Sequence, residues 1–138
     1  MDDTPERILR EATTIAVVGL SRDPGKEAHS VPAVMQAAGF RIIPVNPVAG
    51  TLLGERVYRS LTDIPEPVDL VDVFRPSAEA ASVAREAAAI GAKALWLQQG
   101  IVSAEARAIA AEAGMDYVED RCVAVVRAVA GIRKESND

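Results

Sequence analysis

Short apolar runs rich in β-branched residues alternate with helical patterns along most of the 138-residue chain. Five of these runs are predicted to be strands, at residues 14–18, 40–45, 68–74, 93–97 and 117–118. They are apolar throughout rather than at every second position, which is typical of parallel strands covered on both faces. With right-handed crossovers, the pattern predicts a Rossmann-like α/β fold: a doubly wound, five-stranded parallel sheet of order 3-2-1-4-5.

Capping residues, glycine stops and apolar periodicity predict helices between the strands. A first helix is expected to begin with Thr4 as its N-cap and Pro5 in its first turn. Further helices are predicted over 30–38, over 77–90 with Ser77 as cap and over 104–113 with Ser103 as cap, and a last one near Arg121. Pro32 would then lie in the first turn of its helix, where proline is tolerated. Residues 48–67 are expected to form a long irregular connection with a turn near 60–63.

Length and charge bound the class of protein. A single domain over 1–132 is expected, followed by a frayed charged tail at 133–138. The formal net charge of −5 gives no general reason to expect nucleic acid or an anionic membrane as partner. Cys122 is the only cysteine, and neither a signal core nor a membrane-length apolar run occurs. We therefore expect a cytoplasmic protein that must hold any phosphate-bearing ligand through a local cationic site.

The stretch from Thr14 to Lys26 suggests such a site. It reads Thr-Ile-Ala-Val-Val-Gly-Leu-Ser-Arg-Asp-Pro-Gly-Lys, which is a strand, a turn at Gly19 and a loop with the cations Arg22 and Lys26. A helix follows, and the free N–H groups of a helix N-terminus favour anions. An ordinary connection between strand and helix explains the same stretch, so the rest of the chain must decide.

Three other segments follow predicted strands and carry polar residues: 45–47, 74–76 and 98–100. In an open α/β sheet, ligands bind beyond the carboxyl ends of the strands, where the strand order reverses. The sequence therefore predicts that these segments and the loop 19–26 form one binding site.

The sequence lacks the residues that several familiar activities need. The dinucleotide fingerprint needs three closely spaced glycines and an acid after the second strand, but Gly19 is followed next by Gly25, and Asn46-Pro47 ends the strand. No Walker loop occurs. A deaminase, zincin or thiol protease would lack its metal ligands or base, since His29 is the only histidine and Cys122 the only cysteine.

Five motifs in order resemble the small bacterial CoA-binding proteins, which are similar to the nucleotide-binding domain of the succinyl-CoA synthetase α subunit. They are Gly-Leu-Ser-Arg-Asp-Pro-Gly-Lys-Glu-Ala-His-Ser-Val-Pro (19–32), Val-Asn-Pro (45–47), Val-Asp-Val-Phe-Arg-Pro (71–76), Trp-Leu-Gln-Gln-Gly (96–100) and Glu-Asp-Arg-Cys (119–122). The resemblance covers residues 5 to about 130.

The resemblance implies that coenzyme A is the ligand and assigns a part of the site to each segment. The implied contacts are Gly19, Leu20, Ser21, Arg22 and Lys26 for phosphate; Val45, Asn46 and Pro47 for adenosine; Phe74, Arg75 and Pro76 beside the nucleotide or the pantetheine entrance; and Gln98 and Gly100 for the pantetheine arm. Cys122 would lie within reach of the pantetheine thiol, or would simply pack at the start of the last helix. Structural roles stay open for the others: a solvated charge for Arg75, a turn for Asn46-Pro47, a cap for His29 and a core position for Trp96.

The synthetases need further domains, including a histidine that carries phosphate, and nothing after residue 130 of this sequence is expected to supply them. We therefore interpret it as a non-catalytic or regulatory module that binds CoA or an acyl-CoA, without nucleic acid, membrane or metal. Two alternatives remain: an NAD(P)-binding or redox-sensing Rossmann protein, and a subunit that binds a protein partner under control of CoA.

Overall fold

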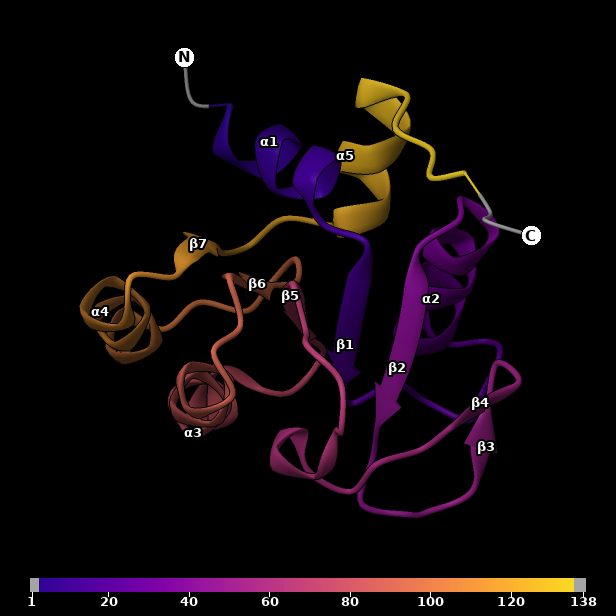
Figure 1. Ribbon diagram of the computed structural model, residues 1–138, viewed down its shortest axis with the longest axis horizontal. Coiled ribbons are helices and arrows are strands. Elements are labelled where there is room, and N and C mark those ends of the chain that lie inside the picture. Colours follow the sequence, from indigo (N-terminus) through magenta and orange to yellow (C-terminus); the bar gives the residue numbers. More distant parts are fainter. Residues whose placement is uncertain (1–2, 136–138) are drawn as a thin grey trace.

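The computed structural model describes residues 3–135 (Figure 1). The helices are α1 (Thr4–Glu11), α2 (Glu27–Ala37), α3 (Ser77–Ala89), α4 (Ala104–Ala113) and α5 (Val123–Ala130). The strands are β1 (Thr14–Val18), β2 (Arg41–Val45), β3 (Thr51–Leu52), β4 (Glu55–Arg56), β5 (Leu70–Val73), β6 (Ala94–Leu97) and β7 (Asp116–Val118), and a 3₁₀ helix spans Leu61–Asp63. None of the helices in residues 3–135 is both long and apolar enough to cross a membrane.

The main sheet contains five parallel strands in the order β2-β1-β5-β6-β7. One face packs on α1, α2 and α5, and the other packs on α3 and α4 (Figure 1). Trp96 of β6 is fully buried against the helices α1, α2 and α5, so its predicted core position is confirmed. The predicted fold class, a single α/β domain with a doubly wound parallel sheet, is confirmed as well.

The predicted strand order is wrong at one place. The third strand of the main sheet, β5, pairs with β1 instead of extending the sheet beyond β2. The returning chain pairs with the outer edge of β2 at its carboxyl end, where Tyr58 forms a parallel bridge with Val45. The carboxylate of Asp69 also accepts the N–H groups of Thr13 and Thr14, at 2.9 and 3.0 Å, which holds the start of β5 beside β1. The strand order therefore reverses between β1 and β5.

Helix α2 begins at Glu27, three residues before the predicted start, and Pro32 lies beyond its first turn. A proline at this position cannot donate to the carbonyl group four residues earlier. That carbonyl, of Ala28, instead accepts the N–H of Ser21 at 3.0 Å. The proline is thus tolerated because the loop after β1 takes up the hydrogen bond that it leaves free.

Other helix starts differ from the predictions by one or two residues. Ser103 caps α4 as predicted, with its hydroxyl accepting the N–H of Ala106. Ser77 and Thr4 are instead the first residues of their helices, and the Ser77 hydroxyl accepts the N–H of Val102. Helix α5 begins at Val123 rather than near Arg121.

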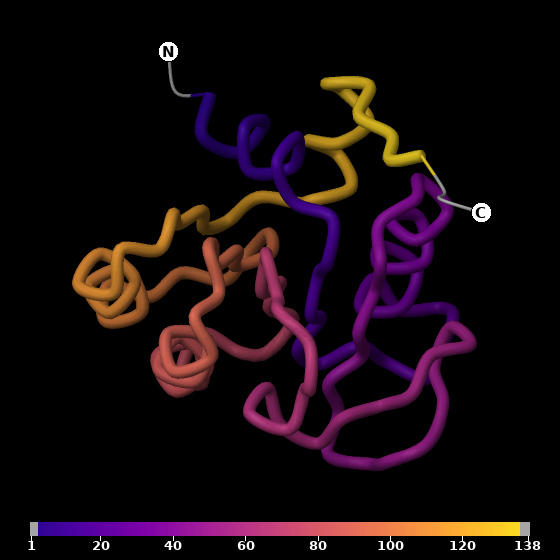
Figure 2. Tube along the Cα trace, in the orientation of Figure 1, coloured from indigo at the N-terminus to yellow at the C-terminus, as the bar shows by residue number. Residues whose placement is uncertain are grey.

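The connection between β2 and β5 contains more structure than predicted, since β3 and β4 form a hairpin before the expected turn at 61–63. It loops around the lower end of β2 before it returns to the sheet (Figure 2). The charged tail is held at Lys134, whose N–H donates to Ala38 and whose ammonium group donates to the Arg10 carbonyl. Residues 136–138 of the predicted tail lie outside the described residues.

Candidate functional site

The segments that follow β1, β2 and β5 meet around a small pocket at the carboxyl edge of the sheet. Its volume is about 110 Å³, and it lies at the reversal of strand order, where a ligand is expected. Five of the predicted site residues line it: Gly19, Val45, Asn46, Pro47 and Arg75. Val18, Arg59, Ser60, Leu61, Val83 and Glu86 complete the lining.

Gly19 lets two loops approach closely at this pocket. Its φ of +92° is unfavourable for other residues. A Cβ atom at this position would lie 2.8 Å from Cδ of Arg75 and 3.2 Å from the Phe74 carbonyl oxygen. The turn after β1 therefore needs glycine both for its backbone conformation and for the passage of the Arg75 side chain.

The two predicted loop cations are placed differently. The Arg22 guanidinium donates from one nitrogen to the carbonyl groups of Val48 and Ala49, at 2.8 and 3.1 Å. Lys26 is exposed at the N-cap of α2, and within residues 3–135 its ammonium group has no ion-pair partner. Arg22 thus fixes the loop after β2 while keeping donors free, and Lys26 offers an uncommitted charge.

Asn46 and Ser21 hold the neighbouring loops together. The Asn46 amide donates to the Leu20 carbonyl at 2.9 Å, and its oxygen accepts the N–H of Val48 at 2.8 Å. The hydroxyl of Ser21 accepts the N–H of Asp23, which leaves its own hydrogen available for donation. Nδ1 of His29 lies 2.7 Å from the Ser21 carbonyl oxygen, so it donates there and Nε2 is the free ring nitrogen. His29 therefore has a structural contact with the loop.

The residues after β5 and β6 extend the same edge. The Arg75 guanidinium is paired with Glu79, at 2.9 Å, and remains half-exposed. Phe74 is partly buried against the core, and Pro76 occupies the N-cap position of α3. Gln98 is buried, and its side-chain oxygen accepts the N–H of Val123 at the start of α5. Gly100 is exposed, and its N–H donates to Asp120.

Cys122 lies apart from the small pocket. It is the partly exposed N-cap of α5 and packs against the core, and it lines a second, larger cavity between α1 and α5. The structure therefore brings five of the predicted residues, which lie at the ends of β1, β2 and β5, together in one pocket and places Cys122 in another.

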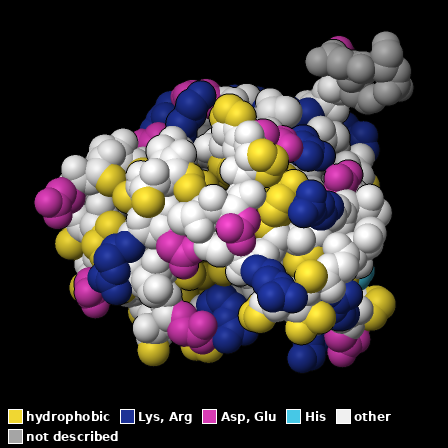
Figure 3. Space-filling view, turned by 60° about the horizontal axis from the view of Figure 1, so that its bottom comes forward, with side chains coloured by type: hydrophobic (Ala, Val, Ile, Leu, Met, Phe, Trp, Pro, Cys, Tyr) yellow, Lys and Arg dark blue, Asp and Glu magenta, His cyan; other side chains and the backbone are white. Residues whose placement is uncertain are grey.

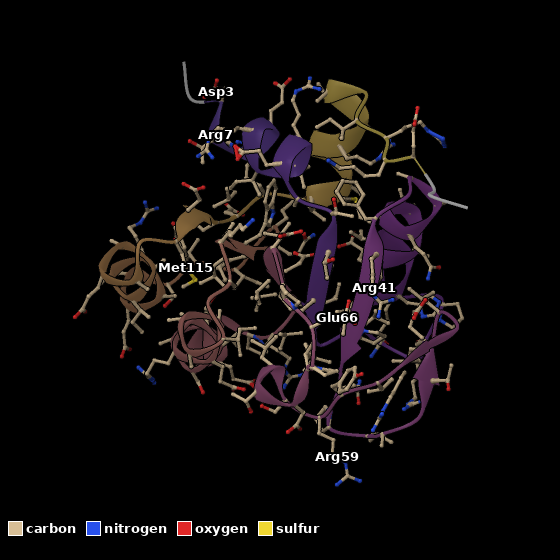
Figure 4. All side chains as sticks on the ribbon, viewed as in Figure 1. Asp3, Arg7, Arg41, Arg59, Glu66 and Met115 are labelled. Carbon is tan, nitrogen blue, oxygen red and sulfur yellow. The ribbon has the colours of Figure 1, made fainter. Side chains whose placement is uncertain are left out.

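Arg59 and Ser60 were missed by the sequence analysis, although both line the small pocket. Arg59 points away from the body of the protein (Figure 4) and, within residues 3–135, forms no ion pair. The only local signal was the expected turn at 60–63, which Ser60 caps. The bridge that carries Arg59 to β2 joins residues distant in sequence, so local patterns could not reveal it.

Positive and negative side chains are interspersed around this end of the sheet (Figure 3). The three cations Arg22, Lys26 and Arg59 have no acidic partner among the described residues, so they can attract an anion. No group of three or more His, Cys, Asp and Glu side chains that could hold a metal ion occurs in the described part of the chain.

Known proteins of similar length resemble this chain in sequence and in fold. The chain is 42% identical over 124 residues to the Bacillus subtilis (strain 168) protein YneT, described as uncharacterized, which covers 90% of this chain and 92% of YneT. A Thermus thermophilus structure, cell-free ID.343, superposes with a TM-score of 0.88 at 40% identity and covers 94% of this chain and 99% of that chain.

A larger relative matches this chain over only a small part of its own length. The ADP-forming acetate–CoA ligase II of Archaeoglobus fulgidus is 35% identical over 82 residues, which are 58% of this chain and 12% of the ligase. The family model described as the CoA binding domain matches residues 13–128, from the start of β1 into α5. The chain belongs to the CoA-binding domain family.

Proposed function

We propose that this protein binds coenzyme A at the carboxyl edge of its sheet, as a binding module without a reaction of its own. The observation that carries the proposal is the pocket at the reversal of strand order. The loops after β1, β2 and β5 line that pocket, and so does the cation Arg59. Arg22 and Lys26 lie farther along the loop after β1. The match to the CoA-binding domain family supports the same ligand.

The nucleotide end of CoA fits this arrangement chemically. Its pyrophosphate and 3′-phosphate need several cationic or N–H donors, which Lys26, Arg59 and the spare donors of Arg22 supply. Val45 and Pro47 give the adenosine an apolar wall, and Gly19 lines the pocket beside them. The pantetheine arm would then run past Phe74 and Pro76 toward Gly100 and Cys122. The protein is expected to act in the cytoplasm.

Thermal unfolding in the presence of ligand tests the proposal. A ligand that binds only the folded state adds about 2.7 kcal/mol of stability at 100 times its dissociation constant. For a domain of this size, that should raise the melting temperature by several degrees. NAD⁺ at equal concentration should have much less effect, because the chain lacks the acid that holds a dinucleotide ribose. Equal shifts with NAD⁺ and CoA, or none with CoA, would overturn the proposal.

Lys26→Ala tests the phosphate loop. Loss of one charge-assisted contact should weaken CoA binding about tenfold, and this difference should shrink as salt screens the exposed charge. Lys93→Ala is the control, since it removes a lysine charge at the opposite edge of the sheet, where Lys93 is 81% exposed and pairs with Asp69 at 3.6 Å. If Lys26→Ala binds CoA like the parent, Lys26 makes no contact with phosphate. Arg22→Ala is less clean because Arg22 also holds the 48–49 loop.

A further inference from the structure

A cavity of about 640 Å³ lies between α1 and α5, and none of the nucleotide contacts proposed above uses it. Its volume is within the range of small-molecule binding sites. The apolar part of its lining consists of Pro5 from α1 and Val125, Val126, Val129 and Ala130 from α5. Val125 and Val129 are 58% and 85% exposed, one turn apart on the same face of α5. These side chains gain by burial if a ligand covers them.

One end of the cavity lies at the carboxyl edge of the sheet. Gln99 follows β6, and Asp120 to Cys122 follow β7, and all of them line it. The two loops are tied together, because the N–H of Gly100 donates to Asp120 at 2.7 Å and the N–H of Arg121 donates to Leu97. The cavity is therefore reached from the same edge of the sheet as the small pocket.

The small pocket and the cavity lie at opposite ends of this edge. The small pocket adjoins β2 and β1, and the cavity adjoins β6 and β7, in a sheet of order β2-β1-β5-β6-β7. At about 4.8 Å between neighbouring strands, the edge from β2 to β7 is about 19 Å long. An extended pantetheine arm that starts at the small pocket would follow this edge and bring its sulfur atom toward the cavity.

The charges at the cavity select among the groups that a thioester can carry. Three carboxylates, of Asp3, Glu6 and Asp120, line it, against the single lining guanidinium of Arg121. Glu6 is paired with Arg10, so the excess negative charge comes from Asp3 and Asp120. A carboxylate on the acyl group would be repelled there, whereas a neutral aliphatic chain would cover the exposed valines.

We infer that this cavity receives the acyl group of an acyl-CoA, and that the acyl group is aliphatic and uncharged. The inference rests on the proposed function, because CoA must first be held at the small pocket. It makes the protein an acyl-CoA binder in preference to a binder of free CoA.

Titration calorimetry with the full chain tests this inference, using CoA, butyryl-CoA, hexanoyl-CoA and succinyl-CoA. Each methylene group that becomes fully buried should tighten binding about fourfold. Hexanoyl-CoA should therefore bind at least tenfold more tightly than CoA. Succinyl-CoA, which has as many acyl carbons as butyryl-CoA but an added carboxylate, should bind more weakly than butyryl-CoA.

The double variant Val125→Ser/Val129→Ser should lose the preference for hexanoyl-CoA and keep the affinity for CoA itself. Both valines are exposed, so the substitutions leave the core intact. Val102→Ser is the matched control, as Val102 is 49% exposed but lies outside the cavity. It should keep the preference.

The outcomes separate the two proposals. If CoA binds and all the thioesters bind equally or more weakly, the acyl site is refuted and the proposed function stands. If the preference survives in the double variant, the acyl group lies elsewhere and the inference is wrong. If neither CoA nor any thioester binds, both proposals fall.

Discussion

Asp72 places a carboxyl group in the middle of the sheet, between Val17 and Trp96 on the neighbouring strands. It is 1% exposed, and its Oδ1 has no hydrogen-bond partner among the described residues. Burial raises the pKa of Asp72 well above its ordinary value, and the N–H of Val73 only partly opposes this. The group is therefore protonated in the folded protein at pH values where the unfolded chain has already released the proton.

The contribution of Asp72 to the free energy of unfolding should therefore fall as pH rises. Above about pH 4 the unfolded chain loses the proton of Asp72 and the folded chain keeps it, so rising pH favours unfolding up to the folded-state pKa. Asp72→Asn removes the ionisation and keeps the shape. The variant should be more stable than the parent at pH 8, by about 1.4 kcal/mol for each unit by which folding raises the pKa.

Urea unfolding at pH 4 and pH 8 measures this effect. The advantage of the asparagine variant should shrink to a few tenths of a kcal/mol at pH 4, where the aspartate is only about half ionised in the unfolded chain and protonated in the folded one. Asp63→Asn, at an exposed position, is the control and should change the stability little. A difference between parent and Asp72→Asn that is the same at both pH values would contradict the prediction.

Cys122 carries the next prediction, which rests on the proposed path of the pantetheine arm. With CoA disulfide, the Cys122 thiolate would attack one sulfur, form a protein–CoA disulfide and release the second CoA as a thiolate, so no other oxidant is needed. Mass spectrometry should show one added CoA that dithiothreitol removes. Cys122→Ser should show none.

The alternatives for Cys122 give different results. A cysteine outside the path of the ligand would react with a small thiol reagent and form no CoA adduct. A cysteine that only packs at the start of α5 would react with neither until the protein is unfolded.

Most of the strands and helices could be predicted because their signals are local. The apolar runs of the five sheet strands, the serine cap of α4 and the glycine stops each depend on a few adjacent residues. The start of α2 could not be predicted in this way. Its Pro32 is tolerated because the Ala28 carbonyl accepts a hydrogen bond from Ser21, a contact formed only when the loop after β1 folds back.

Position 39, at the end of α2, needs glycine for a further reason besides ending the helix. Its φ is +99°, and a Cβ atom there would lie 2.0 Å from the Lys134 carbonyl oxygen. Gly39→Ala should therefore lower the free energy of unfolding by more than about 1 kcal/mol, through backbone strain and displacement of the chain at Lys134. Denaturant unfolding measures the loss.

Gly91→Ala separates the two causes. Gly91 also ends a helix with a positive φ, of +74°, but nothing lies within 4 Å of a Cβ atom there. It should show the backbone strain alone and lose less stability than Gly39→Ala. Equal losses would mean that the contact with Lys134 contributes nothing.

The strand order and part of the site could not be predicted from local sequence, because they depend on contacts between distant segments. Orders 3-2-1-4-5 and 2-1-3-4-5 both occur in doubly wound sheets, and the choice here depends on Tyr58 at the edge of β2 and on Asp69 beside β1. The edge that carries the site could still be predicted, because parallel strands place all their carboxyl ends together. The position of Arg59 at the site could not be predicted, since it depends on how the long connection between β2 and β5 folds back onto β2.

This arrangement predicts where a ligand protects the backbone. Hydrogen exchange with and without CoA should show slower exchange at the loops 19–26, 46–50, 74–76 and 98–100, which share the carboxyl edge. The loops 12–13, 67–69, 91–93 and 114–115 lie at the opposite edge and should exchange at unchanged rates. The comparison uses these loops because they open locally, whereas a ligand slows exchange everywhere in segments that open only by global unfolding. Equal protection at both edges would show that CoA acts on overall stability without a contact at these loops. Protection at the opposite edge alone would place CoA at the amino ends of the strands and contradict the proposed site.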